Sequence, residues 1–398
     1  MKKTYIHLLK GWPGLRWDAA ALAEPLAAVR FEQGRLLGRM ATLGFPLDGE
    51  AELTVLTEEL VRSSAIEGER LDDRQVRSSL ARRLGLDTGS IVPSTDRIDG
   101  LAELMLDATR NFMKPLTTER LFGWHAALFP TGRNAFGRIT VGAWRKPGTA
   151  PMRVVSGPMG RETVHFEAPD ARRVPQEMRD FLTWFDAPPV TDPILHAGLA
   201  HFRFVTIHPF DDGNGRLARA VAEMALVRSD GSPQRFYSMS AQIETERRDY
   251  YDMLEKSQRG GLDVTPWLRW FIGCLARALD RAETTLATVL HKARLMEILN
   301  ALPANPRQRK AVSRLLDGFE GPFTASKYAK MNACSTDTAL RDINALIACG
   351  VLVRGPSGGR STEYRLVNEV ISEIQGAGLG SNVAGQPLLL RPRSGSQP

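Results

Sequence analysis

IHPFDDGNGRLAR, residues 207–219, places a histidine, two aspartates, two arginines and a glycine-rich centre in thirteen positions. It follows the apolar-periodic run DPILHAGLAHFRFVTI (192–207), which predicts a helix that ends before the proline, because the residue before a proline avoids the helical region. His208 is therefore expected at a helix end, outside the core. We expect DDGNG to form a tight loop in which Gly213 and Gly215 adopt positive φ, with a new helix beginning at about Gly215.

A glycine-rich loop at a helix N-terminus offers unpaired N–H groups and partial positive charge to an anion. Arg216 and Arg219 fall on one face of the new helix, and two arginines at an already positive helix end are unfavourable unless an anion binds there. Guanidinium groups hold phosphate oxygens in pairs, and Asp212 supplies a hard oxygen ligand for a phosphate-bound Mg²⁺. Because His208 can take a proton from an attacking hydroxyl, the segment predicts substitution at a nucleotide phosphorus.

Other interpretations of these residues are weaker. DDGNG lacks the further carboxylates and the terminal glutamate of an EF-hand calcium loop. His196, His201 and His208 lack the H-E-x-x-H spacing of a zinc protease, and the chain has no G-x-x-x-x-G-K-[ST] phosphate loop. A lone histidine before proline is usually structural, so the interpretation depends on the conjunction of residues rather than on His208 alone.

HPFDDGNGRLAR (208–219) resembles the Fic motif, H-P-F-x-[D/E]-G-N-G-R-x-x-R, at every specified position. The wider resemblance covers roughly residues 100–285, and the N-terminal stretches YIHLLKGWPGLRWD and SSAIEGERLDDRQVRSSLARRLG resemble an extension found in one Fic subgroup. The resemblance implies an adenylyltransferase that moves AMP from ATP to a Ser, Thr or Tyr hydroxyl of a protein, with release of pyrophosphate. It also implies Mg²⁺ as the metal.

By motif position, the resemblance implies that His208 is the general base, Phe210 the core-facing anchor of the loop and Asp212 the Mg²⁺ ligand. Arg219 is assigned to the γ-phosphate. The ATP-binding residues predicted in this way are Gly213, Asn214, Gly215, Arg216, Leu217, Ala218 and Arg219, with Tyr250 and Tyr251 of ERRDYYDMLEKS on the adenine side.

SSAIEGE (63–69) resembles the Fic inhibitory motif, [S/T]-x-x-x-E-[G/N], with Ser63, Glu67 and Gly68 in the fixed positions. A glutamate near a helix end is usually a solvated surface charge. However, Arg219 without a γ-phosphate is an unpaired cation, and Glu67 could pair with it and occupy the place of that phosphate. We therefore expect autoinhibition. The resemblance also implies an alternative. In some relatives the equivalent glutamate takes part in removing AMP from the modified protein, so this reverse activity, de-AMPylation, stays open.

Helical periodicity dominates the chain, so the predicted fold class is mainly α. It comprises a Fic helical core with a β-hairpin flap, an N-terminal helical extension and a C-terminal winged helix-turn-helix. Two helices are expected between residues 50 and 85, separated at Gly68. Further helices are expected at about 97–113, 117–128, 172–187, 192–206, 215–229, 245–258 and 264–289.

The stretch ITVGAWRKPGTAPMRVVSGPMGRETVHFEAP (139–169) is rich in Gly, Pro and β-branched residues and predicts a long loop with a short hairpin. An extended target segment could pair with an exposed edge of this hairpin, which is otherwise interpreted as ordinary surface structure. The expected target-facing residues of the flap are Met152, Arg153, Val154, Val155 and Ser156.

After Asn300, the runs RQRKAVSRLLDGFE, TASKYAKMN and STDTALRDINALIACG are helix patterns, and VLVRGPSGGRSTEYRL contains two strand-like runs. This order predicts a winged helix-turn-helix. Ser335 is expected to cap the third helix and Gly350 to end it. The expected apolar face of that helix consists of Leu340, Ile343, Leu346 and Ile347.

The same helix is expected to present polar residues to a partner. These residues are Thr336, Thr338, Arg341 and Asn344, joined by Arg354 and Arg360 of the wing. They suit contacts to DNA, but Asp337 and Asp342 would repel phosphate, and such modules also dock proteins or dimerise.

Two further alternatives to the AMP transferase are open. One is a DNA-binding regulator with a nucleotide-sensing Fic core, and the other is an enzyme that transfers a different phosphate-linked group.

The chain of 398 residues, with a net charge of +7 and three cysteines, is long enough for several domains. We predict a helical domain with the inhibitory motif at 1–95, the catalytic domain at 96–290, the winged helix at 300–370 and a disordered tail at 374–398. Too few cysteines are present for a disulfide framework, and no apolar run approaches a membrane span. We expect a cytoplasmic protein with protein substrates and no membrane partner, while a homodimer is left open.

Overall fold

The computed structural model describes residues 4–41, 45–86, 92–134, 137–148, 151–157, 161–301, 304–316, 319, 321–355 and 362–367. The chain divides into two compact units, Met1–Val289 and Leu290–Pro398. Both of the regions predicted at 1–95 and 96–290 fall within the first unit, so the boundary between them stays a prediction. The tail predicted at 374–398 lies outside the described residues.

The first unit is mainly helical and contains two short antiparallel strand pairs, β1–β2 and β3–β4. The predicted fold class is confirmed in its helical part and in its hairpin. In chain order, the elements are η1 (Ile6–Leu8), α1 (Ala19–Met40), α2 (Phe45–Ile66), α3 (Asp73–Leu84), α4 (Asp96–Arg110), α5 (Thr118–Leu128), β1 (Arg133–Asn134), β2 (Gly137–Arg138), β3 (Arg153–Ser156), β4 (Thr163–Glu167), η2 (Ala171–Arg173), α6 (Val174–Asp186), α7 (Pro193–Ile207), α8 (Asn214–Asp230), α9 (Met239–Thr245), α10 (Arg247–Gln258) and α11 (Thr265–Ala301).

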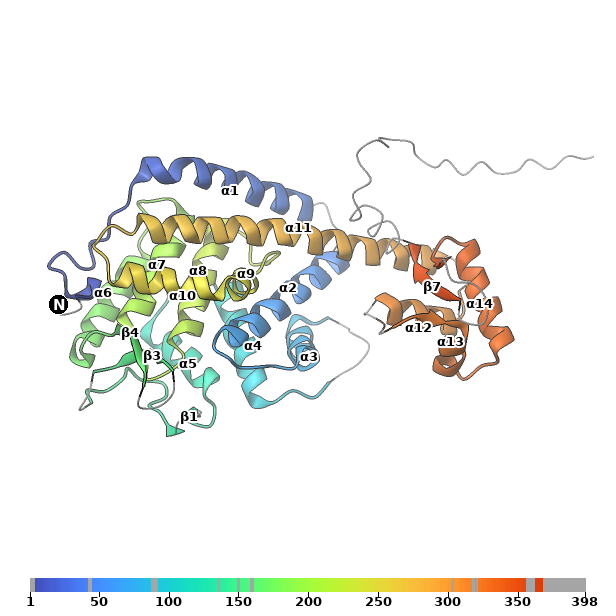
Figure 1. Cartoon of the computed structure of the whole chain (residues 1–398), viewed down its shortest axis with the longest axis horizontal. Helices are drawn as coiled ribbons and strands as arrows, with labels where there is room; N and C mark the ends of the chain where they lie inside the picture. Colours follow the sequence, from blue (N-terminus) through green and yellow to red (C-terminus); the bar gives the residue numbers. More distant parts are fainter. Residues whose placement is uncertain are drawn as a thin grey trace, which may run out of the picture. The chain divides into compact units, whose positions relative to one another are not determined.

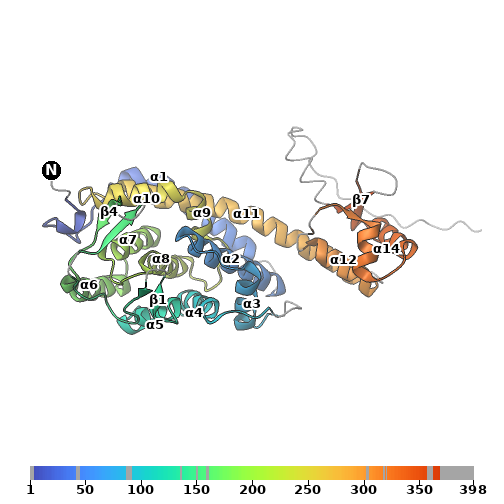
Figure 2. The ribbon, with the colours of Figure 1, turned by 60° about the horizontal axis from the view of Figure 1, so that its bottom comes forward.

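The innermost helices of this unit are α7 and α8, which pack along each other. Every residue of α7 from Ile194 to Ile207 is buried, and so is every residue of α8 from Arg216 to Val227. The buried positions of α7 are mostly apolar, as in a helix that is enclosed on all sides, whereas those of α8 include Arg216, Arg219 and Glu223. In Figure 2, α2, α4, α5, α6 and α10 surround this pair. The loop that joins α7 to α8 carries the 207–219 motif.

The helix α1 was not among the predicted helices, and neither was the short helix α9. Pro25 lies inside α1 and has no N–H to donate to the carbonyl of Ala21. Arg269 of α11 donates to that carbonyl instead, at 3.1 Å. Because α1 lies alongside α11 (Figure 1), a side chain of α11 satisfies the carbonyl that Pro25 leaves without a hydrogen-bond donor within α1. The local sequence contains no sign of this partner.

In its described residues, the second unit contains the end of α11, three short helices and a three-stranded antiparallel sheet of order β5–β7–β6. Its elements are α12 (Pro306–Leu316), β5 (Phe323–Thr324), α13 (Ala325–Asn332), α14 (Thr336–Ala348), β6 (Leu352–Arg354) and β7 (Glu363–Leu366). As expected, Ser335 caps α14 by accepting from the N–H of Thr338, and Gly350 follows it with φ +72°. Arg360 of the predicted wing lies outside the described residues.

Two predictions about α14 are wrong. Leu340 is 37% exposed, and Ala339, with no exposed surface, takes its place on the buried face with Ile343 and Leu346. Asp342 does not face a partner either, because it is buried and accepts hydrogen bonds from Arg307 Nε at 2.8 Å and Tyr328 OH at 3.0 Å. Both errors concern the rotation of α14 about its own axis, which decides which residues face inward. That rotation is set by the packing of α14 against the sheet and α12.

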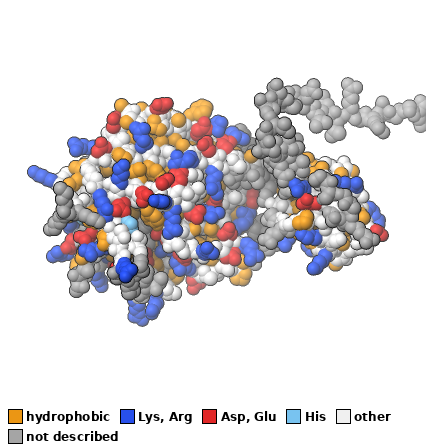
Figure 3. Space-filling model, in the orientation of Figure 1, with side chains coloured by type: hydrophobic (Ala, Val, Ile, Leu, Met, Phe, Trp, Pro, Cys, Tyr) orange, Lys and Arg blue, Asp and Glu red, His pale blue; other side chains and the backbone are white. Residues whose placement is uncertain are grey.

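Figure 3 shows Lys and Arg side chains interspersed with Asp and Glu side chains over this face of the first unit, with no patch of a single sign. In the described part of the chain, no helix is both long enough and apolar enough to cross a membrane.

Candidate active site

His208 occupies the C-cap of α7 in a left-handed conformation, with φ 53° and ψ 60°, so the helix ends before Pro209 as predicted. Arg145, which sequence reasoning missed, holds this turn from outside. Its Nε donates to the carbonyl of His208 at 2.7 Å, and its backbone N–H donates to the carbonyl of Pro209 at 2.9 Å. A non-glycine residue with positive φ is strained, and such positions cluster at functional sites.

The loop after His208 is closed by its own residues. The side-chain amide of Asn214 accepts from the N–H of Phe210 and donates to the carbonyl of Phe210, both at 2.9 Å. Phe210 is fully buried and stacks on His125 with ring centroids 4.2 Å apart. The amide side chain of Asn214 therefore shapes the loop, while its backbone N–H belongs to the first turn of α8.

The two glycines of the loop serve different purposes. Gly213 adopts φ +80°, as predicted, directly before α8. Gly215 does not adopt positive φ, which corrects the prediction, because α8 already begins at Asn214. A Cβ atom at position 215 would collide with Oε1 of Glu67. Gly215 is thus required for the close approach of a carboxylate to the helix N-terminus, where an anion is stabilised.

Arg219 is the centre of the contact between α8 and the end of α2, and its side chain is only 3% exposed. Its Nε donates to Ser63 Oγ, and its Nη2 donates to the carbonyl of Ser63 and to Glu67 Oε1, each at 2.9 Å. Burial is the largest single influence on the pKa of Arg219 and lowers it, but Glu67, Tyr250 and Tyr251 together raise the pKa of the guanidinium above its ordinary value. Nη1 is buried without a hydrogen-bond partner among the described residues.

Arg216 has a carboxylate partner that sequence reasoning missed. Its Nη1 donates to Glu69 Oε2 at 3.0 Å, and Arg97 of α4 donates to the same oxygen at 2.5 Å. The guanidinium also lies over the ring of Phe129, 5.2 Å from its centroid, and its Nε has no partner among the described residues. The sequence did contain an indication of this second carboxylate. In EGE (67–69), two glutamates flank a glycine that adopts φ +81°.

Asp212 accepts from the N–H of Gly213 at 2.6 Å and, through Oδ2, from the side-chain amide of Asn134 at 2.9 Å. Each carboxylate oxygen therefore keeps a lone pair, which suits one ligand of a Mg²⁺ ion whose other ligands are phosphate and water. No group of three or more His, Cys, Asp or Glu side chains forms a metal site of its own within the described ranges.

The electrostatic setting of His208 favours its neutral form, because burial lowers its pKa to about 4. Its Nδ1 lies 3.3 Å from the carbonyl of Val205. In the neutral ring, an N–H at Nδ1 can donate to that carbonyl only if the lone pair lies on Nε2. The geometry thus leaves Nε2 able to accept a proton at neutral pH.

A cavity of about 500 Å³ contains Glu67, His208 and Gly215 together with residues of the β3–β4 flap and of α10. Asp212, Arg216 and Arg219 do not line it. Among the predicted site residues, those that line it are Glu67, Val154, Val155, Ser156, His208, Gly215, Tyr250 and Tyr251. Met152 and Arg153 line a neighbouring hollow instead. Leu217 and Ala218 are fully buried in the core and do not line the cavity.

The two tyrosines differ in their surroundings. Tyr250 is 1% exposed, and its hydroxyl lies 3.1 Å from His201 Nε2. Tyr251 is 38% exposed, and its hydroxyl donates to the carbonyl of Ile66 at 3.2 Å. Of the two, Tyr251 therefore offers the accessible aromatic face, next to the end of α2.

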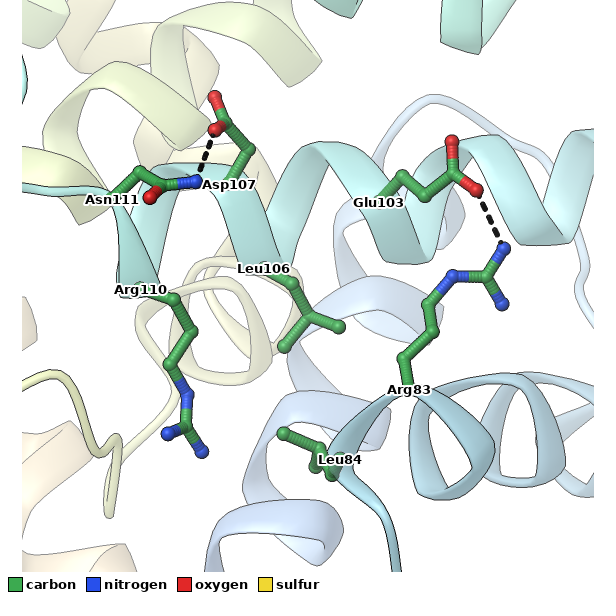
Figure 4. Close-up of a pocket in the computed structure, with 7 residues that line it drawn as sticks. All are labelled: Arg83, Leu84, Glu103, Leu106, Asp107, Arg110 and Asn111. Carbon is green, nitrogen blue, oxygen red and sulfur yellow. Dashed lines mark hydrogen bonds and ion pairs between the residues drawn. The ribbon is translucent and has the colours of Figure 1, made fainter.

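Another hollow, of about 450 Å³, lies between α3 and α4 (Figure 4). Its charged groups are already paired with one another or with nearby helices. Arg83 donates to Glu103 at 2.8 Å, and Arg110 donates to Glu52 of α2 at 2.7 Å. These pairs hold α2, α3 and α4 together.

Comparisons with known proteins give matches over two parts of the chain. Residues 115–226 match the model of the Fic/DOC family, and residues 5–86 match a domain of unknown function, DUF4172. The chain is 34% identical over 132 residues to "Protein adenylyltransferase Fic" of Nematostella vectensis, covering 32% of this chain and 28% of that protein. It is 26% identical over 279 residues to the protein of the same name from Culex quinquefasciatus, covering 67% of this chain and 50% of that protein. The chain thus spans half or less of the length of these relatives.

Among solved structures, the fold is similar to that of a Fic family protein from Desulfovibrio desulfuricans G20. The TM-score is 0.50 at 22% identity, and the match covers 88% of this chain and 97% of that one. At this identity, the likeness concerns the fold alone.

Proposed function

We propose that this chain, whose residues 115–226 form a Fic/DOC domain, transfers AMP from ATP to a hydroxyl group of a protein and is held inactive by Glu67. The observation that carries the proposal is the position of a neutral imidazole, His208, at the entrance to a helix N-terminus flanked by two buried arginines. The adenylyltransferase names of the relatives support the same reaction.

In this reaction, His208 Nε2 takes the proton of the attacking hydroxyl while the oxygen bonds to the α-phosphorus and pyrophosphate leaves. The low pKa of His208 keeps the imidazole unprotonated before the step. The first N–H groups of α8 receive phosphate oxygens, as helix N-termini do for anions in general. Arg216 Nε and Arg219 Nη1 are buried donors without partners in the described part of the chain, and phosphate oxygens would satisfy both.

Asp212 is the residue that would hold a phosphate-bound Mg²⁺, with support from Asn134 at its Oδ2. The ion would neutralise phosphate charge during the transfer.

The inhibitory role of Glu67 is supported by where its carboxylate lies. Oε1 is bonded to Arg219 and lies against Gly215, at the N-terminus of α8 where a phosphate would bind. A carboxylate in that place excludes one phosphate group of ATP and displaces the rest. Since a shift of about 1 Å can cost roughly a hundredfold in rate, misaligned ATP would not react.

The target protein is proposed to meet the site along β3. This strand pairs with β4 on one side only in the described residues, so its other edge can accept an extended peptide. Val155 is 48% exposed and lines the cavity that contains His208, so a target segment paired with β3 would lie beside that cavity.

The test is covalent transfer by the full chain with Glu67→Gly, incubated with Mg²⁺, ATP labelled at the α-phosphate and a cell lysate. We expect label on lysate proteins, release of pyrophosphate and an adenylyl group on a hydroxyl side chain by mass spectrometry. Compared with the lysate alone, ATP labelled at the γ-phosphate should give no additional label on the proteins when the chain is added. Absence of both additional α-label and additional pyrophosphate would refute the proposal, and additional γ-label would indicate a kinase instead.

A second candidate activity, binding of DNA by the second unit, gains support from the burial of Asp342. With that carboxylate inside the unit, the exposed face of α14 carries Thr336, Arg341 and Asn344 beside a single acid, Asp337. Arg354 donates to Asn344 Oδ1 at 2.8 Å, which brings a second cation to this face. Mobility shifts of duplex DNA across a salt series test this, with Arg341→Ala expected to weaken binding and to reduce its salt dependence.

A further inference from the structure

Three side chains opposite the anion site form a continuous hydrogen-bonded row. Ser156 Oγ on β3 lies 2.6 Å from Nε2 of His165 on β4, and Nδ1 of His165 lies 2.5 Å from Oε2 of Glu255 on α10. All three line the cavity that also contains His208 and Gly215. A hydroxyl, an imidazole and a carboxylate in this order are the arrangement in which proteins activate a nucleophile.

The carboxylate determines which nitrogen of His165 faces the serine. An ionised carboxylate only accepts, so in the neutral ring the hydrogen lies on Nδ1 and the lone pair of Nε2 faces Ser156 Oγ. Arg259 pairs with the other oxygen of Glu255 and donates through Nη2 to the carbonyl of Val164 at 2.7 Å. Glu255 is thus tied through Arg259 to the strand that carries His165.

The hairpin contains an irregularity at this place. Val154 is paired with Phe166 and Val155 with Val164, so His165 is the extra residue at a register shift in β4. Bulges of this kind turn a side chain away from the regular alternation and are frequent beside active sites. Here the extra residue contacts both the partner strand and α10.

The other hydroxyl groups on the cavity wall are less suited to react. Tyr250 and Tyr251 both have a pKa raised by burial, which disfavours loss of their protons. The Tyr250 hydroxyl is buried against His201, and the Tyr251 hydroxyl donates to a backbone carbonyl. Ser156 is exposed on the flap, and the partner of its hydroxyl is a base.

We propose that Ser156 is an AMP acceptor within the same chain, with His165 as the base that receives its proton and Glu255 as the residue that positions His165. The inference rests on the adenylyl transfer proposed above. In the step, Ser156 Oγ bonds to the α-phosphorus of ATP, the bond from that phosphorus to the bridging oxygen breaks, and pyrophosphate leaves. The proton of the hydroxyl passes to His165 Nε2.

The sequence around Ser156 allows a direct test. Trypsin cleaves after Arg153 and Arg161 and releases the peptide VVSGPMGR (154–161), in which Ser156 is the sole hydroxyl. The full chain with Glu67→Gly is incubated with Mg²⁺ and ATP, and its tryptic peptides are measured by mass spectrometry. We expect the mass of one adenylyl group on this peptide and its loss in the Ser156→Ala variant. Thr163→Ala, which removes the hydroxyl opposite Ser156 on the hairpin, is the matched control and should leave the label in place.

The roles of the two other residues are tested by the ratio of label on this peptide to label on all other peptides. Glu255→Gln should lower that ratio about tenfold, and His165→Gln at least as much, because general bases contribute on the order of a hundredfold or more. A merely structural effect on the site would lower all labels together and leave the ratio unchanged, which would overturn the assignment of these two residues.

Transfer within one chain is tested by dilution. The rate at which the 154–161 peptide of the Glu67→Gly chain gains label, per molecule of chain, should not change when the chain is diluted at a fixed concentration of ATP. A rate that falls in proportion to the chain concentration would show transfer between chains and overturn the intramolecular assignment. If other peptides are labelled but 154–161 never is, the inference about Ser156 fails and the proposed activity stands. If no peptide is labelled and no pyrophosphate appears, the proposed activity itself fails.

Discussion

The 208–216 loop and the 63–69 segment meet at the same anion site but are held there in different ways. The loop is closed by bonds between neighbours, since Asn214 bonds both backbone groups of Phe210, four residues away. The segment reaches the site through bonds that span about 150 residues of chain, from Ser63 and Glu67 to Arg219 and from Glu69 to Arg216. The groups proposed to react are thus placed by local structure, whereas the groups proposed to control them arrive by tertiary contact.

This difference implies that the two regions can be disabled separately. Damage to the loop should remove the chemistry, because His208 and the N-terminus of α8 belong to one short piece of chain. Damage to the segment should leave the loop intact and release the arginines for phosphate. Substitution of the two carboxylates of the segment should have different effects. Glu67 lies against Gly215, whereas Glu69 accepts hydrogen bonds from both Arg216 and Arg97.

The largest effect is expected from His208→Ala in the Glu67→Gly background. Loss of the general base should lower AMP transfer by roughly 10² to 10⁴-fold, while ATP binding measured by calorimetry should persist, because the anion site remains. Transfer is measured with ATP labelled at the α-phosphate. A variant that still transfers at the parent rate would assign the base elsewhere in the cavity.

Glu67→Gly should have the next largest effect, in the opposite direction. Removal of the carboxylate from the N-terminus of α8 should raise AMP transfer about a hundredfold, because the α-phosphorus of ATP can then align with the attacking hydroxyl. Glu67→Gln, which keeps the shape but not the charge, should raise it less. The matched control is Glu58→Gln on the same helix, where the carboxylate pairs with Arg281 instead, and its rate should equal that of the wild type.

A smaller effect is expected from Glu69→Gln in the Glu67→Gly background. Loss of a charge-assisted bond of about 1.5 kcal/mol should leave Arg216 poorly oriented and lower transfer roughly tenfold. Arg97→Ala removes the other partner of Glu69 but keeps its bond to Arg216, so its effect should be smaller. An increase in transfer on Glu69→Gln would identify Glu69 as a second inhibitory carboxylate rather than a brace.

The pH dependence should show the smallest effect. Burial lowers the pKa of His208 to about 4 from the ordinary value of 6.5, so the ring stays neutral as the pH falls through 6 and gains its proton only near 4. The ring resonance of His208, identified by its loss in His208→Ala, should therefore be constant between pH 6 and 8 in an NMR titration. A midpoint near 6.5 would show that the imidazole is solvated and that burial does not set its charge.

The lowered pKa of His208 also makes the free energy of unfolding depend on pH. An unfolded chain, with an ordinary His208, takes up a proton near pH 6.5, whereas the folded chain does so only near 4. The contribution of this residue to the free energy of unfolding is therefore complete above about pH 6.5 and is lost as the pH falls toward 4. His196, whose pKa is also lowered by burial to about 4, acts in the same direction.

Much of the site could be read from the residues because its signals are local. Pro209 ends α7, Gly213 supplies the positive φ before α8, and Arg216 and Arg219 share a face of that helix because they are three residues apart. These relations operate within one or two helical turns. The burial of Phe210 likewise agrees with the expectation for the motif.

The errors have a common physical origin in contacts between distant segments. Gly215 was assigned a positive φ, yet its real constraint is the carboxylate of Glu67, which comes from another helix. Leu340 and Asp342 were assigned to the wrong faces of α14, because propensity alone does not set helical phase. Arg145 and Asn134 were missed because nothing beside them in the chain indicates that they support the motif loop.

The amino-acid sequence by itself determined the helical class, the order of the elements around the motif and the chemistry proposed for residues 208–219, since spacing, turn residues and charge act over a few residues. Only the tertiary structure decided which carboxylate meets which arginine, that Ser156, His165 and Glu255 form one row, and how Arg269 completes the helix interrupted by Pro25. The reason is that hydrogen bonds and ion pairs depend on distance in space, and packing of helices around α7 and α8 brings together groups that the chain keeps far apart.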